Sequence, residues 1–215
     1  MNRRSTAIVA VVAASAVAAS TAAVALAVPQ QGTATEAAVE ATEIPGTPVE
    51  LFGTSFLLPD DYAALYLQDG EMQSVGDADR LSETTMASIE EQLAAAGPQS
   101  IVFVDRSTAR DDGLTTALVT VTPTNGLTLG TSNEQMQQWL TSLFPDQEGT
   151  VASQPVPEVP NASFTFTETT DEVAWQVTEY VFQYADAAVS VRFSTVDDTG
   201  EDRAEFDQIM ASMSR

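Results

Sequence analysis

The 215-residue chain contains no cysteine, no histidine and no lysine. The absence of cysteine excludes disulfide bonds, thiolate nucleophiles and zinc sites built on thiolates. Without histidine or lysine, the chain also lacks the bases that activate a serine nucleophile in the common hydrolases. A phosphate-binding loop of the P-loop type is excluded as well, because it requires a lysine. We therefore expect that the protein is not an enzyme.

Positive charge is scarce: eight arginines stand against 31 acidic residues, giving a net charge of −23. Nucleic-acid binding depends on clustered lysine and arginine side chains, so we exclude nucleic acid as a partner. The same negative charge disfavours contact with anionic membrane surfaces. It also keeps an exported protein soluble, and we expect a monomer.

The N-terminus has the pattern of an export signal. Arg3 and Arg4 precede residues 7–28, which carry no charge, and residues 25–27 (Ala-Leu-Ala) match the small-x-small pattern that signal peptidase cleaves. We interpret residues 1–27 as a signal peptide. The alternative is an uncleaved membrane anchor that extends to residue 28, because an apolar segment of this length can cross a bilayer.

Both interpretations place the rest of the chain outside the cytoplasm, either secreted or in the cell envelope. A mature chain from Val28 would keep six arginines and 31 acidic residues, a net charge of −25. Residues 28–48 are rich in proline, glycine, threonine and glutamate and hold no large apolar cluster. We expect a flexible linker there, followed by one globular domain over residues 49–215.

Three segments of this domain have the apolar spacing of amphipathic helices. The first begins at Ser82 and stops at Gly97, the second follows a capping box of Ser132 and Gln135, and the third lies near residues 201–213. The apolar stripes consist of Met86, Ile89, Leu93 and Ala96, of Met136, Trp139, Leu140 and Leu143, and of Phe206, Ile209, Met210 and Met213. On this spacing Trp139 is more consistent with core packing than with a ligand platform.

Other apolar segments have the length and alternation of β-strands. We expect strands near residues 56–58, 64–68, 101–104, 117–121, 164–166, 173–184 and 187–195. The segment 101–104 is apolar on both faces and is expected at the centre of the sheet, paired with 117–121 across a turn at 111–113. Strands in adjacent runs with interspersed helices predict an α+β fold, an antiparallel β-sheet flanked by helices.

Three motifs resemble the PsbP-like fold family. They are a first strand that ends in a Pro-Asp turn (residues 56–62), a long aromatic strand followed by another (173–184 and 187–195), and a closing helix (206–213). The resemblance covers residues 49–215. The family includes LpqN-type envelope proteins of actinobacteria, whose lipidation cysteine this chain lacks. It implies a PsbP-like α/β/α sandwich and an accessory or binding role without shared catalytic residues.

One candidate site is a metal site. Asp197, Asp198, Glu201 and Asp202 lie within six residues and offer the oxygen ligands that calcium prefers, though not at EF-hand spacing. The alternative is that Thr199 caps the last helix and that the acidic residues favour its N-terminal dipole. Calcium is thus the one candidate cofactor.

A second candidate site contains Arg106 and Arg110, which flank the turn after the central strand and are candidates for contacting an anionic ligand or partner. The alternative is pairing with local carboxylates, which contributes little at a surface. Residues 161–163 (Asn-Ala-Ser) match a glycosylation sequon, but we attach no functional expectation to it.

The sequence favours a non-catalytic, exported accessory protein of the cell envelope. We expect it to bind either a protein partner or an apolar ligand between sheet and helices, the partner being an envelope protein or a lipid. The alternative is a calcium-binding extracellular domain. A carboxylate-dependent hydrolase is a third hypothesis, for which no acidic pair lies in a recognisable motif. A membrane is expected only as the partner of an uncleaved N-terminal segment.

Overall fold

The computed structural model describes residues 46–76, 78, 81–108, 114–126, 128–154, 159–170, 173–196 and 200–215. The strands of its larger sheet are β3 (Tyr62–Gln68), β4 (Glu71–Val75), β5 (Ser100–Asp105), β6 (Thr116–Pro123), β7 (Gly149–Ala152), β8 (Asn161–Thr170), β9 (Val173–Gln183) and β10 (Ala187–Thr195). They lie in the order β4-β3-β5-β6-β10-β9-β8-β7, and every neighbouring pair is antiparallel. The predicted α+β class with an antiparallel sheet is therefore confirmed.

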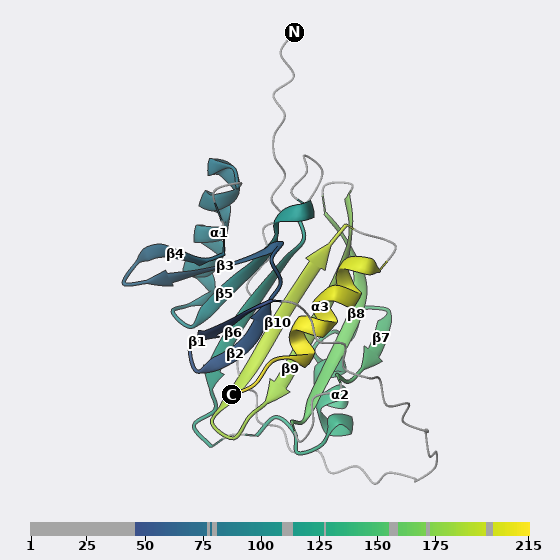
Figure 1. The fold of residues 1–215 in the computed structure, drawn as a ribbon. Helices are drawn as coiled ribbons and strands as arrows, with labels where there is room; N and C mark the ends of the chain where they lie inside the picture. Colours follow the sequence, from purple (N-terminus) through teal and green to yellow (C-terminus); the bar gives the residue numbers. More distant parts are fainter. Residues whose placement is uncertain are drawn as a thin grey trace, which may run out of the picture.

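Helices cover both faces of this sheet (Figure 1). The helix α3 (Glu201–Ala211) and the hairpin of β1 (Thr47–Leu51) and β2 (Thr54–Leu58) lie on one face. The helices α1 (Glu83–Ala96) and α2 (Asn133–Ser142) lie on the other face. The arrangement is a sheet between two helical layers, because each face of the sheet is apolar and must be buried.

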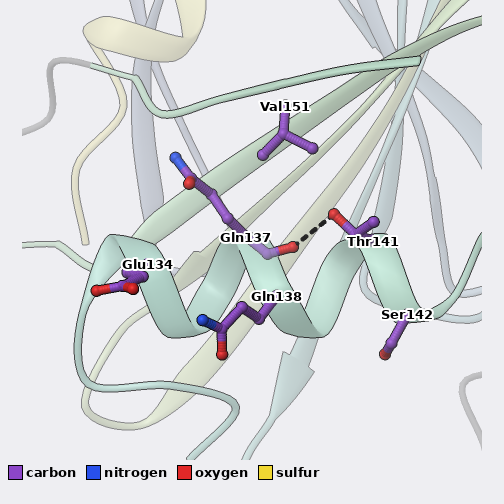
Figure 2. Close-up of a pocket in the computed structure, with 6 residues that line it drawn as sticks. All are labelled: Glu134, Gln137, Gln138, Thr141, Ser142 and Val151. Atoms are coloured by element: carbon purple, nitrogen blue, oxygen red, sulfur yellow. Dashed lines mark hydrogen bonds between the residues drawn. The ribbon is translucent and has the colours of Figure 1, made fainter. Parts of the chain in front are cut away.

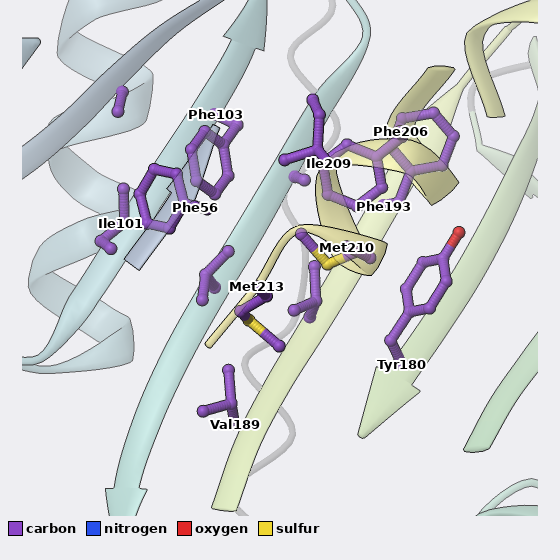
Figure 3. Close-up of a cluster of buried hydrophobic side chains, with 14 of the residues drawn as sticks. Phe56, Ile101, Phe103, Tyr180, Val189, Phe193, Phe206, Ile209, Met210 and Met213 are labelled. Atoms are coloured by element: carbon purple, nitrogen blue, oxygen red, sulfur yellow. The ribbon is translucent and has the colours of Figure 1, made fainter. Parts of the chain in front are cut away.

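The largest core lies between the sheet and α3 (Figure 3). Alternate residues of the strands point into it, so aromatic side chains from distant segments meet there. The rings of Phe193 and Phe206 stack with centroids 4.7 Å apart, and Phe56 meets Phe103 edge-on at 4.7 Å. These contacts fill the space between α3 and the sheet and fix the position of the helix.

Two smaller cores lie on the opposite face. Under α1 the side chains of Leu65 and Val102 pack against Ile89 and Leu93. Under α2 the core is built from Met136 and Leu140 of the helix and from residues of β8 and β9, namely Ala162, Phe164, Phe166, Trp175, Val177 and Val181. Trp139 is partly buried against this second cluster, which agrees with its interpretation as a packing residue.

Most predicted elements are present. All six residues of β5 are buried, and Ile101 pairs with Val119 of β6, as the sequence indicates. The strands β1, β4 and β7 are additional to the prediction. They are short and partly polar, and two of them are edge strands, so their sequences lack a clear alternation of apolar and polar residues. The first strand begins at Thr47, two residues before Val49.

Two details of the helices differ from the prediction. Leu143 is the C-cap of α2 and is 44% exposed, so it does not belong to the core. The N-cap position of α3 is Gly200, in a left-handed conformation with φ of 82°, and the predicted cap Thr199 lies outside the described residues. The capping box of α2 is present, but Gln135 Oε1 accepts its hydrogen bond from the N–H of Thr131 rather than Ser132.

Candidate functional site

The predicted metal-site residues are only partly described. Asp197 and Asp198 lie outside the described residues. Glu201 is the first residue of α3 and is exposed. Asp202 follows it in the first turn, and its side chain reaches the end of the sheet.

Asp202 meets two buried threonines. Its Oδ2 accepts a hydrogen bond from Thr115 Oγ1 at 2.6 Å and one from Thr195 Oγ1 at 2.7 Å. The two hydroxyl oxygens are themselves 2.9 Å apart. Thr115 immediately precedes β6 and Thr195 is the last residue of β10, so the three oxygens come from three separate elements.

A buried carboxylate and a buried phenol lie beside this group. Asp105 ends β5 and pairs across the sheet with Tyr62, the first residue of β3. The N–H of Asp105 donates to the carbonyl of Thr115 at 3.0 Å. Both side chains continue the alternation that faces α3, and each residue is only 2% exposed.

Tyr62 is one of two tyrosines at this core whose buried hydroxyl has no hydrogen-bond partner among the described residues, and Tyr184, at its edge, is the other. Tyr180, under the same helix, donates its hydroxyl to Asp207 Oδ1 at 2.7 Å. A buried hydroxyl without a partner is destabilising.

Two carboxylic acids near Tyr62 have raised pKa values. Burial raises the pKa of Asp105, a hydrogen bond from Ser107 opposes this, and the charges of Asp202 and Asp61 raise it further. Burial likewise raises the pKa of Glu205, on the second turn of α3. The charges of Asp105, Asp61 and Asp202 raise it further. We refer to Asp61, Asp105, Asp202 and Glu205 as the acidic cluster.

The pKa of Tyr62 is also raised, first by burial and then by the charges of Asp105, Glu205 and Asp202. The charges of three carboxylates of the cluster thus act on this phenol. Sequence reasoning identified Asp202 but missed Tyr62, Asp105 and Glu205. The available signal was the alternation in residues 101–105, which turns Asp105 to the same side as Ile101 and Phe103.

Arg106 has a structural role at the edge of this cluster. Its Nε donates to the carbonyl of Asp61 at 3.2 Å, and a terminal guanidinium nitrogen donates to the carbonyl of Asp60. The side chain thus holds the turn before β3 against the end of β5. The other predicted contact residue, Arg110, lies outside the described residues.

A separate depression of about 530 Å³ lies between α2 and β7 (Figure 2). Five of its six lining residues have polar side chains, and the six are Glu134, Gln137, Gln138, Thr141, Ser142 and Val151. Gln137 donates its side-chain amide to Ser153 at 2.8 Å, which ties α2 to the segment after β7. Sequence reasoning missed this site because it did not predict β7.

The sequon residue Asn161 is a structural residue. It is fully buried, and its side-chain nitrogen donates to the carbonyls of Gln154 and Val159 at 3.2 and 2.8 Å. Its side-chain oxygen accepts from the N–H of Gln154 at 2.6 Å. The amide is therefore inaccessible to a glycosylating enzyme in the folded chain.

Two classes of site receive no direct support from the described part of the chain. No three acidic side chains there are grouped closely enough to hold a metal ion by themselves. The described helices also lack the combined length and apolar character that a bilayer span requires.

The comparisons with known proteins give distant structural similarities only. No protein-family model matches the chain, and no curated protein does. Cyanobacterial PsbP (CyanoP) from Synechocystis is 12% identical, with a TM-score of 0.44 over 83% of this chain and 97% of that one. The Ran-binding protein Mog1p of Saccharomyces cerevisiae is 11% identical, with a TM-score of 0.43 over 80% of this chain and 96% of that one.

A protein from Bacteroides thetaiotaomicron is 9% identical, with a TM-score of 0.42 over 75% of this chain, and the match spans only 44% of that protein. A PsbP protein is thus among the structures similar to this chain, in line with the resemblance seen in the sequence. A relationship to LpqN-type proteins stays a prediction. None of these proteins assigns a function to the chain at such identities.

Proposed function

We propose that this chain is a non-catalytic, exported envelope protein that binds an extended segment of a protein partner in the depression between α2 and β7. The observation that carries the proposal is the position of β7. It is the last strand of the sheet, and among the described residues no strand pairs with its outer edge. An open edge can accept an extended polypeptide as an additional strand.

The helix beside this edge supplies the second wall. Glu134, Gln138 and Thr141 are exposed along one side of α2 and face the depression. Amide and hydroxyl groups can hydrogen-bond a peptide, while the one carboxylate and the net charge of −23 disfavour an acidic one. We infer a partner segment that is neutral or basic.

A protein partner is favoured over an apolar ligand held between α3 and the sheet. That space is filled by aromatic rings from β2, β5, β10 and α3 that pack edge-on or stacked, as Figure 3 shows. Catalysis is disfavoured for the reasons of composition given above and because Asp105 is buried away from any large substrate.

Site-specific photocrosslinking in the native envelope tests this proposal. A photoreactive residue at Gln138, in the depression, is expected to crosslink one dominant protein. The same residue at Glu90, exposed on α1, serves as the control because it lies away from the depression. Crosslinks to the same proteins from both positions, or to lipid only, would contradict a peptide partner at β7.

A further inference from the structure

Three hydrogen-bonded oxygens meet at the N-terminus of α3. Asp202 Oδ2, Thr115 Oγ1 and Thr195 Oγ1 form a nearly equilateral triangle with sides of 2.6, 2.7 and 2.9 Å. While the carboxylate is ionised, two hydroxyl hydrogens can bridge only two of these three contacts. A cation above the triangle would let all three oxygens direct lone pairs at it, with the hydroxyl hydrogens turned outward.

The unpartnered hydroxyl of Tyr62 is the second, independent observation. The residue is 2% exposed, its oxygen is buried, and it pairs across the sheet with Asp105. A buried phenol ordinarily donates a hydrogen bond, as Tyr180 does to Asp207. An ion or an ion-bound water at this position would supply the missing partner.

The charges around this point are strongly unbalanced. Asp61 comes from the turn before β3, Asp105 from β5, and Asp202 and Glu205 from α3, with Glu201 exposed beside them. Two basic residues are nearby: Arg106 donates to the carbonyls of Asp60 and Asp61, and Arg203 Nε lies 3.6 Å from Asp207 Oδ2. A divalent cation would offset the repulsion within the acidic cluster.

We propose that Asp202, Thr115 and Thr195, with the hydroxyl of Tyr62, form a binding site for a divalent cation that prefers oxygen ligands, namely Ca²⁺. Asp105 and Glu205 supply further negative charge around it. Calcium suits a set of carboxylate and neutral oxygens of irregular geometry, whereas Mg²⁺ demands a near-ideal octahedron. The site shares only Asp202 with the segment 197–202 that the sequence indicated.

The ligand set predicts weak binding. It contains one directly placed carboxylate, in agreement with the lack of any grouped set of three acidic side chains among the described residues. We therefore expect a dissociation constant of about 10⁻⁴ to 10⁻³ M, as in extracellular calcium modules. The proposal is independent of the peptide-binding function, since the two sites lie on opposite faces of the sheet.

Thermal unfolding of the full chain provides the first test, with CaCl₂ compared with NaCl at equal ionic strength. We expect a higher Tm in CaCl₂, and we expect Asp202→Asn and Thr195→Val to abolish this difference. Glu90→Gln removes one charge from the exposed face of α1 and is the matched control that retains it. An equal Tm in both salts, or a calcium effect that persists in Asp202→Asn, would overturn the proposal.

Terbium luminescence provides a second test that does not depend on stability. Tb³⁺ prefers oxygen ligands as Ca²⁺ does, and a nearby tyrosine sensitises its emission. We expect emission that calcium competes away and that falls in Tyr62→Phe. If Asp202→Asn does not fold, Glu205→Gln replaces it, and we expect its calcium affinity to fall about tenfold. Unchanged affinity in Glu205→Gln together with unchanged emission in Tyr62→Phe would contradict the site.

Discussion

At the scale of single residues, two buried tyrosines under one helix behave differently. Tyr180 has an acceptor in Asp207, which also accepts from Gln154 Nε2 at 2.8 Å. Tyr62 has carboxylates around it but no partner among the described residues. The inward direction of Asp105 follows from strand alternation in the sequence. The meeting of Thr115 with Thr195 does not, because it depends on how β6 and β10 pair.

Removing the charge of Asp105 should stabilise the protein. Its Oδ1 accepts a hydrogen bond from the N–H of Ser107 at 2.8 Å, and the side-chain oxygen of an asparagine can accept the same bond. In Asp105→Asn the repulsion from Asp202 and Asp61 disappears. We expect the free energy of unfolding at pH 7, without calcium, to rise by on the order of 1 kcal/mol.

Urea unfolding measures this change, with Glu90→Gln as the matched control. A substantial loss of stability in Asp105→Asn would mean that the buried carboxylate is itself stabilising, and would contradict the proposed repulsion.

The acidic cluster also predicts the direction of the pH dependence. Because the pKa values of Asp105 and Glu205 are raised in the folded chain, their contribution to stability is fully present below the ordinary carboxyl pKa. It is lost as the pH rises through the raised values. The exposed Asp186, whose pKa is lowered by the hydrogen bonds from Arg215, acts in the opposite direction.

We therefore expect the free energy of unfolding, without calcium, to fall as the pH rises above about 4.5. In the double variant Asp105→Asn/Glu205→Gln this fall should be smaller. Urea midpoints across this pH range measure both. An identical pH dependence in the wild-type chain and the double variant would exclude these two groups as its source.

At the scale of elements, the attachment of α3 depends on one aromatic residue. Phe206 is fully buried and stacks on Phe193, while Phe103 and Tyr180 lie 6.3 and 5.9 Å away between ring centroids. The spacing of the apolar residues predicted this face of α3. It also placed Leu143 in the core, which is wrong because α2 ends before that residue and leaves it exposed.

These two residues give a matched pair of predictions. Phe206→Ala should lower the free energy of unfolding by about 3–5 kcal/mol, because it leaves a cavity in a close-packed core. Leu143→Ala should change it by less than about 1 kcal/mol, since the side chain is largely in water already. Chemical denaturation distinguishes the two, and equal effects would contradict the assignment of α3 to the core and of Leu143 to the surface.

The long elements were predicted from the sequence and the short edge strands were not, for a physical reason. Long strands and helices that bury one face have a clear period, and β10, whose buried residues alternate along the strand, is an example. Edge strands such as β4 and β7 bury little, so the period is weak. The depression beside β7 was therefore not predictable from the sequence, whereas the α+β class was.

At the scale of the whole molecule, the excess of negative charge should make stability depend on salt. Residues 49–215 contain 28 acidic residues and six arginines, a net charge of −22. Self-repulsion of this kind destabilises the compact state and is screened over about 10 Å at 0.1 M salt. We expect the Tm to rise with NaCl up to a few tenths molar, as calorimetry would show.

A few ion pairs act against this trend. Arg192 contacts Glu179 at 2.6 Å and also pairs with Glu168, and salt weakens such pairs. A Tm that does not change with ionic strength would contradict this prediction. It would mean that the loss of ion pairs cancels the screening of repulsion, or that the charges are too dispersed to matter.

Calorimetric titration of CaCl₂ into the full chain at pH 7 tests the cation site at the N-terminus of α3 most directly. We predict binding at one site with a dissociation constant of about 10⁻⁴ to 10⁻³ M, retained in Glu90→Gln and lost in Asp202→Asn. Heats no larger than those of dilution, or the same binding in Asp202→Asn, would contradict the site.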